Sequence, residues 1–254
     1  MGTFSIKGST LKIIAVISMI IDHTGATILQ SMLNRRGILG NAVLGLESIV
    51  TLDGENRTLA IAWWVMRMVI GSIAFPVYCF LLIEGFLHTK SVAKYSLRLL
   101  LFAFLSEIPF DLALHQNLFT MHYQNVFFTL LIGLLVLWGM MWFKKNEHVG
   151  KFAGSIVIMA AGMFLAEILN TDYGAAGILF IVLLYLYRKQ KELQILSGCL
   201  AGVLVLQEWA APLAFPFIAA YKGERGLKMK YFFYFIYPAH LLLLYGLCII
   251  LGLT

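Results

Sequence analysis

The stretch that decides the fold runs from Leu11 to Leu33 and reads LKIIAVISMIIDHTGATILQSML. About 20 mainly apolar residues are enough to cross the roughly 30 Å hydrocarbon core of a bilayer as a helix. Asp22 and His23 lie near the middle of this stretch, and His23 is about 18 Å from Leu11 at ~1.5 Å per residue. Because an ionisable group at that depth is costly, the two residues mark a candidate functional site.

The rest of the chain also has the composition of a membrane protein. Of its 254 residues, 61% are hydrophobic and only 13% are charged, whereas soluble domains average roughly 45–50% apolar and about 25% charged residues. We therefore expect a single integral membrane domain over residues 1–254. The cysteines Cys79, Cys199 and Cys248 lie in apolar runs, and their spacing predicts neither a metal site nor a disulfide framework.

The apolar runs predict an all-α transmembrane bundle of about nine spans, with eight or ten as alternatives. The expected spans are Leu11–Leu33, Ile61–Leu87, Leu97–Leu114, Val126–Phe143, Phe152–Leu169, Gly174–Tyr187, Leu193–Trp209, Pro212–Tyr221 and Tyr231–Leu253. Residues Asn34 to Ala60 are expected to form a loop that contains a short interfacial helix. Pro76 is expected to kink the second span, because proline interrupts the hydrogen-bond ladder of a helix.

Basic residues alternate between the predicted loops. The loops after the second, fourth, sixth and eighth spans are rich in Lys and Arg, whereas the loops after the third, fifth and seventh contain none. Since cytoplasmic loops carry an excess of Lys and Arg, this alternation predicts that the N-terminus lies inside and the C-terminus outside. The net charge of +6 thus indicates topology and contact with membrane lipid, and we expect no nucleic-acid partner.

Ionisable residues of three predicted spans are expected at one depth in the membrane. Glu107 and Asp111 are four residues apart and therefore share a helix face, and His240 reaches a depth similar to that of His23. Such a layer suits general acid–base chemistry or a proton path, although its members can also serve only to join helices. We expect Glu107 or Asp111 to orient His23, and Asp22 to pair with an arginine or a backbone donor.

A second set of candidate residues lies nearer the ends of the spans. Cationic and hydrogen-bonding side chains there suit a phosphate-rich cytosolic ligand or anionic lipid headgroups. The candidates are Arg67, Glu84, His88, Arg98, Asn125, Arg225, Lys228 and Lys230. The alternatives are that Arg67 only extends toward the outer surface and that the basic loops only set the topology. The sequence contains no glycine-rich motif of a nucleotide hydrolase, which argues against such an activity.

Several segments together resemble the TraX family of integral membrane proteins. These segments are Leu11–Ala15 with Ile21–Gly25, Ala74–Pro76, Leu82–Thr89, Ser106–Asp111, Asn125–Thr129, Arg225–Gly226, Lys230–Tyr234 and Tyr237–His240. The named member of that family is associated with N-terminal acetylation of conjugative pilin, and the family is similar to multi-pass membrane acyltransferases. Those enzymes often carry a basic residue and a histidine separated by ten residues in the first span. Lys12 and His23 have that spacing, with Lys where Arg is usual.

The resemblance implies an acetyltransferase of the bacterial cytoplasmic membrane that uses acetyl-CoA as co-substrate and holds no permanent cofactor or metal. His23 would act as general base or carry the acyl group, Glu107 or Asp111 would fix its tautomer, and Asn125 or His240 would donate to the oxyanion. The acceptor would be an amine or hydroxyl of a pilin-like peptide or a glycan. Two alternatives stay open: a proton-coupled transporter that uses the same layer, and a non-catalytic assembly protein.

Overall fold

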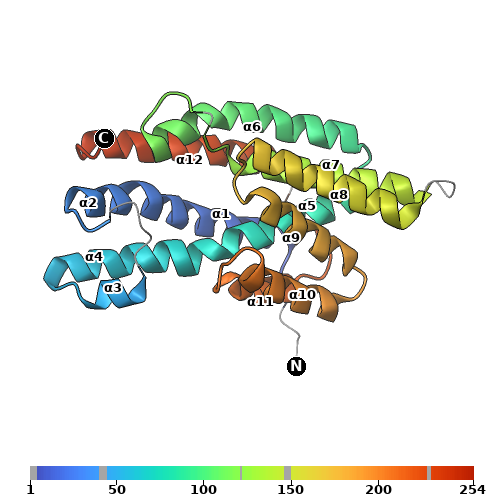
Figure 1. The fold of residues 1–254 in the computed structure, drawn as a ribbon, viewed down its shortest axis with the longest axis horizontal. Coiled ribbons are helices and arrows are strands. Elements are labelled where there is room, and N and C mark those ends of the chain that lie inside the picture. The colour runs from blue at the N-terminus through green and yellow to red at the C-terminus, as the bar shows by residue number, and fades with distance from the viewer. Residues whose placement is uncertain (1–4, 40–44, 121, 146–149, 228–229) are drawn as a thin grey trace.

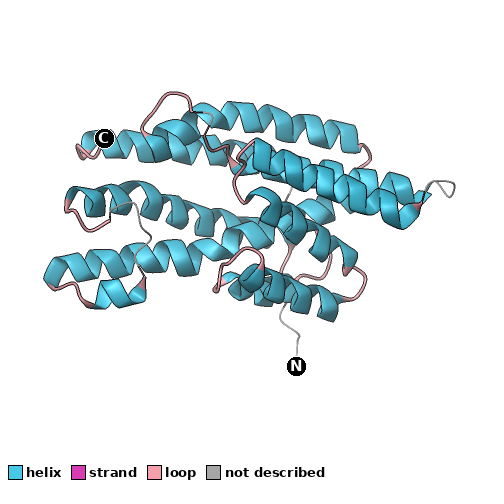
Figure 2. Ribbon diagram, in the orientation of Figure 1, coloured by secondary structure: helices cyan, strands magenta, loops and turns pink. Residues whose placement is uncertain are grey.

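The chain folds into an elongated helical bundle (Figures 1 and 2). The computed structural model describes residues 5–39, 45–120, 122–145, 150–227 and 230–254, and the regular elements in this part of the chain are all helices, joined by loops and turns that include two isolated bridges. The all-α prediction is therefore confirmed. The longer helices are α1 (Gly8–Thr24), α4 (Gly54–Trp64), α5 (Ala74–His88), α6 (Val92–His115), α7 (Val126–Lys145), α8 (Lys151–Ile168), α9 (Gly174–Leu186), α10 (Lys191–Leu204) and α12 (Lys230–Ile250).

Two continuous helical segments contain irregular turns where they pack against each other. In the first, the π-helical η1 (Gly25–Leu29) joins α1 to α2 (Gln30–Arg35). In the second, the π-helical η2 (Val65–Ile70) and the 3₁₀-helical η3 (Gly71–Ile73) join α4 to α5. The irregular turns end at Ile73, three residues before Pro76, which has no N–H and whose ring crowds the carbonyl four residues earlier. The predicted disturbance at Pro76 thus takes the form of altered helical turns that face α1.

Among the described residues, four helical segments are long and apolar enough to cross a membrane. They are Gly8–Arg35, Gly54–His88, Val126–Lys145 and Tyr231–Ile250. Helix α6 has 24 residues but carries Lys94, Arg98, Glu107 and Asp111, and α9 has only 13 residues, or about 20 Å. Each of the predicted apolar runs contains a helix, although the seventh, Leu193–Trp209, is helical only as far as Leu204. The helix lengths differ so much that the count of nine spans and the orientation of the termini stay predictions.

Helix ends that the alternation of charges assigns to the same side of the membrane contact one another in the structure. At one end of the bundle, the Ile6 backbone N–H donates to the Ala220 carbonyl over 3.0 Å, and Lys191 Nζ donates to the Tyr221 carbonyl over 2.9 Å. At the other end, the Gln116 amide donates to the Leu253 carbonyl over 3.1 Å. The predicted inner ends of the first, seventh and eighth spans therefore lie together. The predicted outer ends of the third and last spans also meet, and Arg35 of the first span donates to the Thr254 carbonyl over 3.4 Å.

The predicted first loop is largely helical. Helix α3 (Leu46–Val50) forms where the interfacial helix is expected, but α4 already begins at Gly54, where acidic Glu55 in the first turn favours a helix start. Trp63 of α4 packs with Leu33 and Ile49 in a small core separate from the main one. The expected loop up to Ala60 is thus corrected: its second half extends the next helix and is held by apolar contacts.

Helix α7 begins inside the bundle. Asn125, directly before its first residue, is fully buried, and its amide donates to the Ala103 carbonyl over 2.8 Å and to the Glu107 carboxylate. Its side-chain oxygen accepts from the Phe127 N–H over 3.1 Å, which caps the helix. A helix N-terminus at this depth must satisfy its free N–H groups, and Asn125 with the nearby Glu107 provides for this.

Close packing between α10 and the segment η4 (Ala211–Ala214)–α11 (Phe215–Ala220) depends on Gly198. A Cβ at Gly198 would collide with the Phe215 ring, so we expect Gly198→Ala to destabilise the protein by about 1–3 kcal/mol through overpacking. Thermal unfolding of the detergent-solubilised protein measures this effect. Gly246→Ala is the matched control, because a Cβ there meets no atom within 4 Å. An unchanged melting temperature for Gly198→Ala would contradict the described packing.

Candidate functional site

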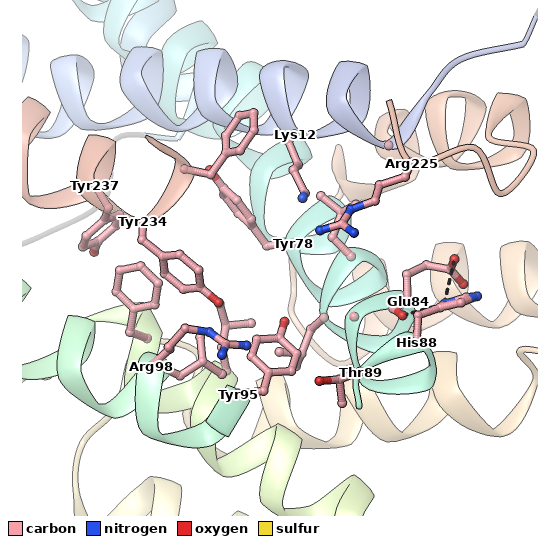
Figure 3. Close-up of a pocket in the computed structure, with 18 of the residues that line it drawn as sticks. Lys12, Tyr78, Glu84, His88, Thr89, Tyr95, Arg98, Arg225, Tyr234 and Tyr237 are labelled. Carbon is pink, nitrogen blue, oxygen red and sulfur yellow. Dashed lines mark hydrogen bonds and ion pairs between the residues drawn. The ribbon is translucent and has the colours of Figure 1, made fainter. Parts of the chain in front are cut away.

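A cavity of about 660 Å³ lies between α1, α5, α6, α7 and α12 and is closed on one side by the loop that follows α11 (Figure 3). Cationic side chains from four different segments line it: Lys12, Lys90, Arg98 and Arg225. Glu84 is the one carboxylate among its described lining residues. The excess of positive charge makes this cavity suited to an anionic ligand, since Arg and Lys are the usual partners of phosphate groups.

Glu84 is engaged by two neighbours at the mouth of the cavity. The Tyr221 hydroxyl donates to Glu84 Oε2 over 3.2 Å, and His88 Nδ1 lies 4.0 Å from the same oxygen. Burial, together with the Glu84 carboxylate, raises the pKa of Tyr221 to about 12. Tyr221 therefore stays protonated at neutral pH, so its hydrogen bond directs the one acidic lining group toward the loop that follows α11.

Arg225 is held at the cavity by backbone contacts with the start of α1. The Gly8 N–H donates to the Glu224 carbonyl over 2.7 Å, and the Ser9 N–H donates to the Arg225 carbonyl over 3.1 Å. Gly226 follows with φ +69°, and a Cβ at this position would collide with the Ser9 hydroxyl. Glycine alone suits this conformation and this close approach, which explains why Gly226 follows Arg225 here.

The inner end of the cavity lies beside two histidines. Tyr237 lines this end, opposite Glu84 and His88 in Figure 3, and is 3% exposed. Its ring meets that of His23 edge-on, with centroids 5.8 Å apart, and that of His240 with centroids 5.6 Å apart. Tyr237 therefore connects the cavity to the histidine of the first helix.

His23 and His240 form a hydrogen-bonded pair whose tautomers follow from their partners. His23 Nδ1 lies 2.7 Å from His240 Nε2, and His240 Nδ1 lies 2.8 Å from the Ile236 carbonyl oxygen. A carbonyl can only accept, so a neutral His240 carries its proton on Nδ1 and accepts at Nε2. His23 must then donate from Nδ1, and its Nε2 keeps the free lone pair of a base.

Asp22 forms an ion pair with Arg67. Arg67 donates to Asp22 Oδ1 over 2.7 Å, so the expectation that Asp22 pairs with an arginine is confirmed. Gly71 allows this contact, because a Cβ there would collide with the Asp22 carboxylate. Arg67 was predicted to bind substrate or to reach the outer surface, but the structure ties it to Asp22 and does not place it among the cavity residues.

The prediction that Glu107 or Asp111 orients His23 is wrong, because the described contacts of these two carboxylates do not involve His23. Glu107 is bound by Asn125, and Asp111 accepts from the Thr120 N–H over 2.7 Å and lies 3.4 Å from His115 Nδ1. Their local partners are the start of α7 and the loop before it. The partner of His23 is His240, and the amide of Asn125 is already engaged.

The structure brings together Glu84, His88, Arg98 and Arg225 of the predicted binding set. Lys228 lies outside the described residues, and of Lys230 only its place as the first residue of α12 is described. The sequence prediction assigned no role to Tyr237. Its signal was the spacing of Tyr237 and His240, three residues apart in one helix, which places both on the same face.

The fold and the site define an all-helical membrane protein with a cationic cavity that ends beside a buried histidine pair. The chain belongs to the TraX family, because the family model described as TraX protein matches residues 7–248. A relative from Dichelobacter nodosus, the probable fimbrial assembly protein FimC of serogroup H1, is 28% identical over 261 residues, covering 92% of each chain. The comparison with solved structures finds no match.

The ion pair between Asp22 and Arg67 is expected to stabilise the packing of the first two helical segments. Arg67→Met leaves the Asp22 carboxylate without its cation. We expect a loss of about 2–3 kcal/mol, less than for a fully buried pair, because the side chains are 30% and 20% exposed. Thermal unfolding in detergent measures the loss, and the double variant with Asp22→Asn should recover part of it.

Arg36→Met provides the control for this experiment. Arg36 lies 3.6 Å from Glu55, in a pair whose side chains are 37% and 90% exposed, and such surface pairs contribute little. The two arginines should therefore differ clearly in their effect on the melting temperature. Equal decreases in melting temperature for Arg67→Met and Arg36→Met would show that the Asp22–Arg67 pair stabilises the protein no more than the exposed Arg36–Glu55 pair does.

Proposed function

We propose that this protein is an acetyltransferase of the bacterial cytoplasmic membrane that uses cytosolic acetyl-CoA. The observation that carries the proposal is the position of the cavity, whose mouth is cationic and whose inner end is formed by Tyr237, beside His23. A nucleotide with several phosphates would bind at Lys90, Arg98 and Arg225. Its acyl thioester would extend along the cavity toward the histidine pair.

His23 is the general base in this proposal. Its Nε2 takes the proton of the acceptor amine or hydroxyl as that group attacks the thioester carbonyl carbon. The tetrahedral intermediate collapses, the C–S bond breaks, and the CoA thiolate takes the proton back from His23. His240 accepts the Nδ1–H of His23, so it orients the ring and stabilises the imidazolium that forms between the two proton transfers.

The acceptor is proposed to be a subunit of a pilus or fimbria, with a free amine or hydroxyl near the membrane surface. Support comes from the Dichelobacter nodosus relative, whose name describes a probable fimbrial assembly protein. Acyl transfer to such a subunit would be one way to contribute to assembly. The predicted topology places the basic end of the bundle, and with it the mouth of the cavity, on the cytosolic side.

Binding of acetyl-CoA to the detergent-solubilised protein is the first test. We expect the affinity to fall about tenfold when Arg98 or Arg225 is replaced by Gln, a change of ~1.4 kcal/mol, and to fall further at high salt. Arg36→Gln at the opposite end of the bundle should leave the affinity unchanged. A folded protein that binds neither acetyl-CoA nor CoA would contradict the proposal and favour proton-coupled transport through the same residues.

Transfer of labelled acetyl to a peptide with a free N-terminal amine tests the role of His23. We expect His23→Gln to bind acetyl-CoA as the wild type does and to transfer acetyl at least about 100-fold more slowly, in line with the loss of a general base. His122→Gln, a change in the exposed loop before α7, is the matched control. Transfer at the wild-type rate by a folded His23→Gln protein would exclude this role.

A further inference from the structure

The Tyr237 hydroxyl is a buried donor at the inner end of the cavity. Tyr237 is 3% exposed, and its hydroxyl, whose oxygen lies within reach of the Val126 backbone N–H, has no acceptor for its proton among the described residues. Leaving a buried hydroxyl unpaired is unfavourable, and most such groups in native proteins are satisfied by protein or water. Because Tyr237 also lines the cavity, a ligand that fills the cavity can supply the acceptor that the hydroxyl lacks.

We propose that the Tyr237 hydroxyl donates a hydrogen bond to the thioester carbonyl oxygen of the bound acyl donor and is therefore a catalytic residue. This inference rests on the proposed acetyltransferase function. As the acceptor adds to the carbonyl carbon, negative charge grows on that oxygen, and a fixed donor stabilises it. The hydroxyl keeps its own proton throughout, while the proton of the acceptor moves to His23.

The positions of the neighbouring groups fit this role. The Tyr237 ring contacts both histidine rings, so a carbonyl oxygen held by its hydroxyl lies near the base that removes the acceptor proton. Val126, the first residue of α7, lines the same cavity, so the partial positive charge of this helix N-terminus adds to the field at the same place.

The two donors expected from the sequence are already engaged in other contacts. The amide of Asn125 binds the Ala103 carbonyl and the Glu107 carboxylate. The Nδ1–H of His240 is directed to the Ile236 carbonyl, and its Nε2 accepts from His23. The Tyr237 hydroxyl, by contrast, can donate a hydrogen bond to a ligand oxygen without giving up another acceptor, because its proton has none among the described residues.

Tyr237→Phe is the direct test, because it removes the hydroxyl and keeps the ring that packs against Phe127. Tyr245→Phe, the same change on the same helix but outside the cavity lining, is the control. With a free-amine peptide as acceptor, we expect kcat of Tyr237→Phe to fall about 100-fold, as for loss of one oxyanion donor. The KM for acetyl-CoA and the melting temperature should stay close to those of the wild type.

A spectroscopic measurement separates this role from a structural one. Acetonyl-CoA, a ketone analogue that cannot be cleaved, carries a carbonyl whose infrared band moves to lower frequency when the oxygen accepts a hydrogen bond. With a ¹³C-labelled carbonyl, we expect the band to lie below its position in an aprotic solvent on the wild type and on Tyr245→Phe, and at that position on Tyr237→Phe. This readout needs no acceptor and no turnover.

The outcomes distinguish this inference from the proposed function. If the wild type binds no CoA derivative, both are overturned. If the wild type binds and transfers acetyl but Tyr237→Phe does so with unchanged kcat, or if the carbonyl band of wild-type-bound acetonyl-CoA lies at its position in an aprotic solvent, only the assignment of Tyr237 is overturned. The wild-type spectrum decides the question even if Tyr237→Phe does not fold.

Discussion

An ionisable group inside an apolar helix bundle must find a polar partner, because neither lipid nor packed side chains replace its hydration. This constraint arranges the centre of the molecule. Asp22 forms an ion pair with Arg67 of the second helical segment. His23, the next residue in the chain, forms a hydrogen bond with His240 of the last helix. Two successive residues of α1 thus connect it to two different segments, and the irregular turns η1 and η2 lie beside these contacts.

The same constraint separates the structural polar groups from those available for chemistry. Glu107 and Asn125 satisfy the buried start of α7, and Asp111 holds the loop before it. The histidine pair has an ordered set of tautomers that leaves one basic nitrogen. Next to it lies a cavity with a cationic mouth. The proposed acyl transfer rests on this arrangement, with anion-binding side chains at one end of the cavity and the histidine pair behind Tyr237 at the other.

Much of this arrangement could be predicted from the sequence. The apolar runs predicted the helices, and the depth of His23 and His240 along their helices placed them in one layer. The partner of His23 could not be predicted. The position of a residue along its helix gives its depth in the membrane, but it does not give the rotation of the helix about its axis, which decides the neighbours that the residue faces. The role of Asn125 in capping the buried start of α7 could not be predicted either. Helix α7 was expected to start at the membrane surface, where its free N–H groups would bind water.

By itself, the sequence determined that the chain is an α-helical membrane protein of the TraX family, where its long apolar helices lie and which side chains are too polar for their surroundings. Hydrophobicity and spacing are properties of one segment at a time, so one chain suffices to establish them. Only the tertiary structure decided that His23 meets His240, that Asp22 meets Arg67 and that Tyr237 forms the inner end of the cavity. Those contacts depend on the rotation and crossing of separate helices, which arise from packing among residues distant in sequence.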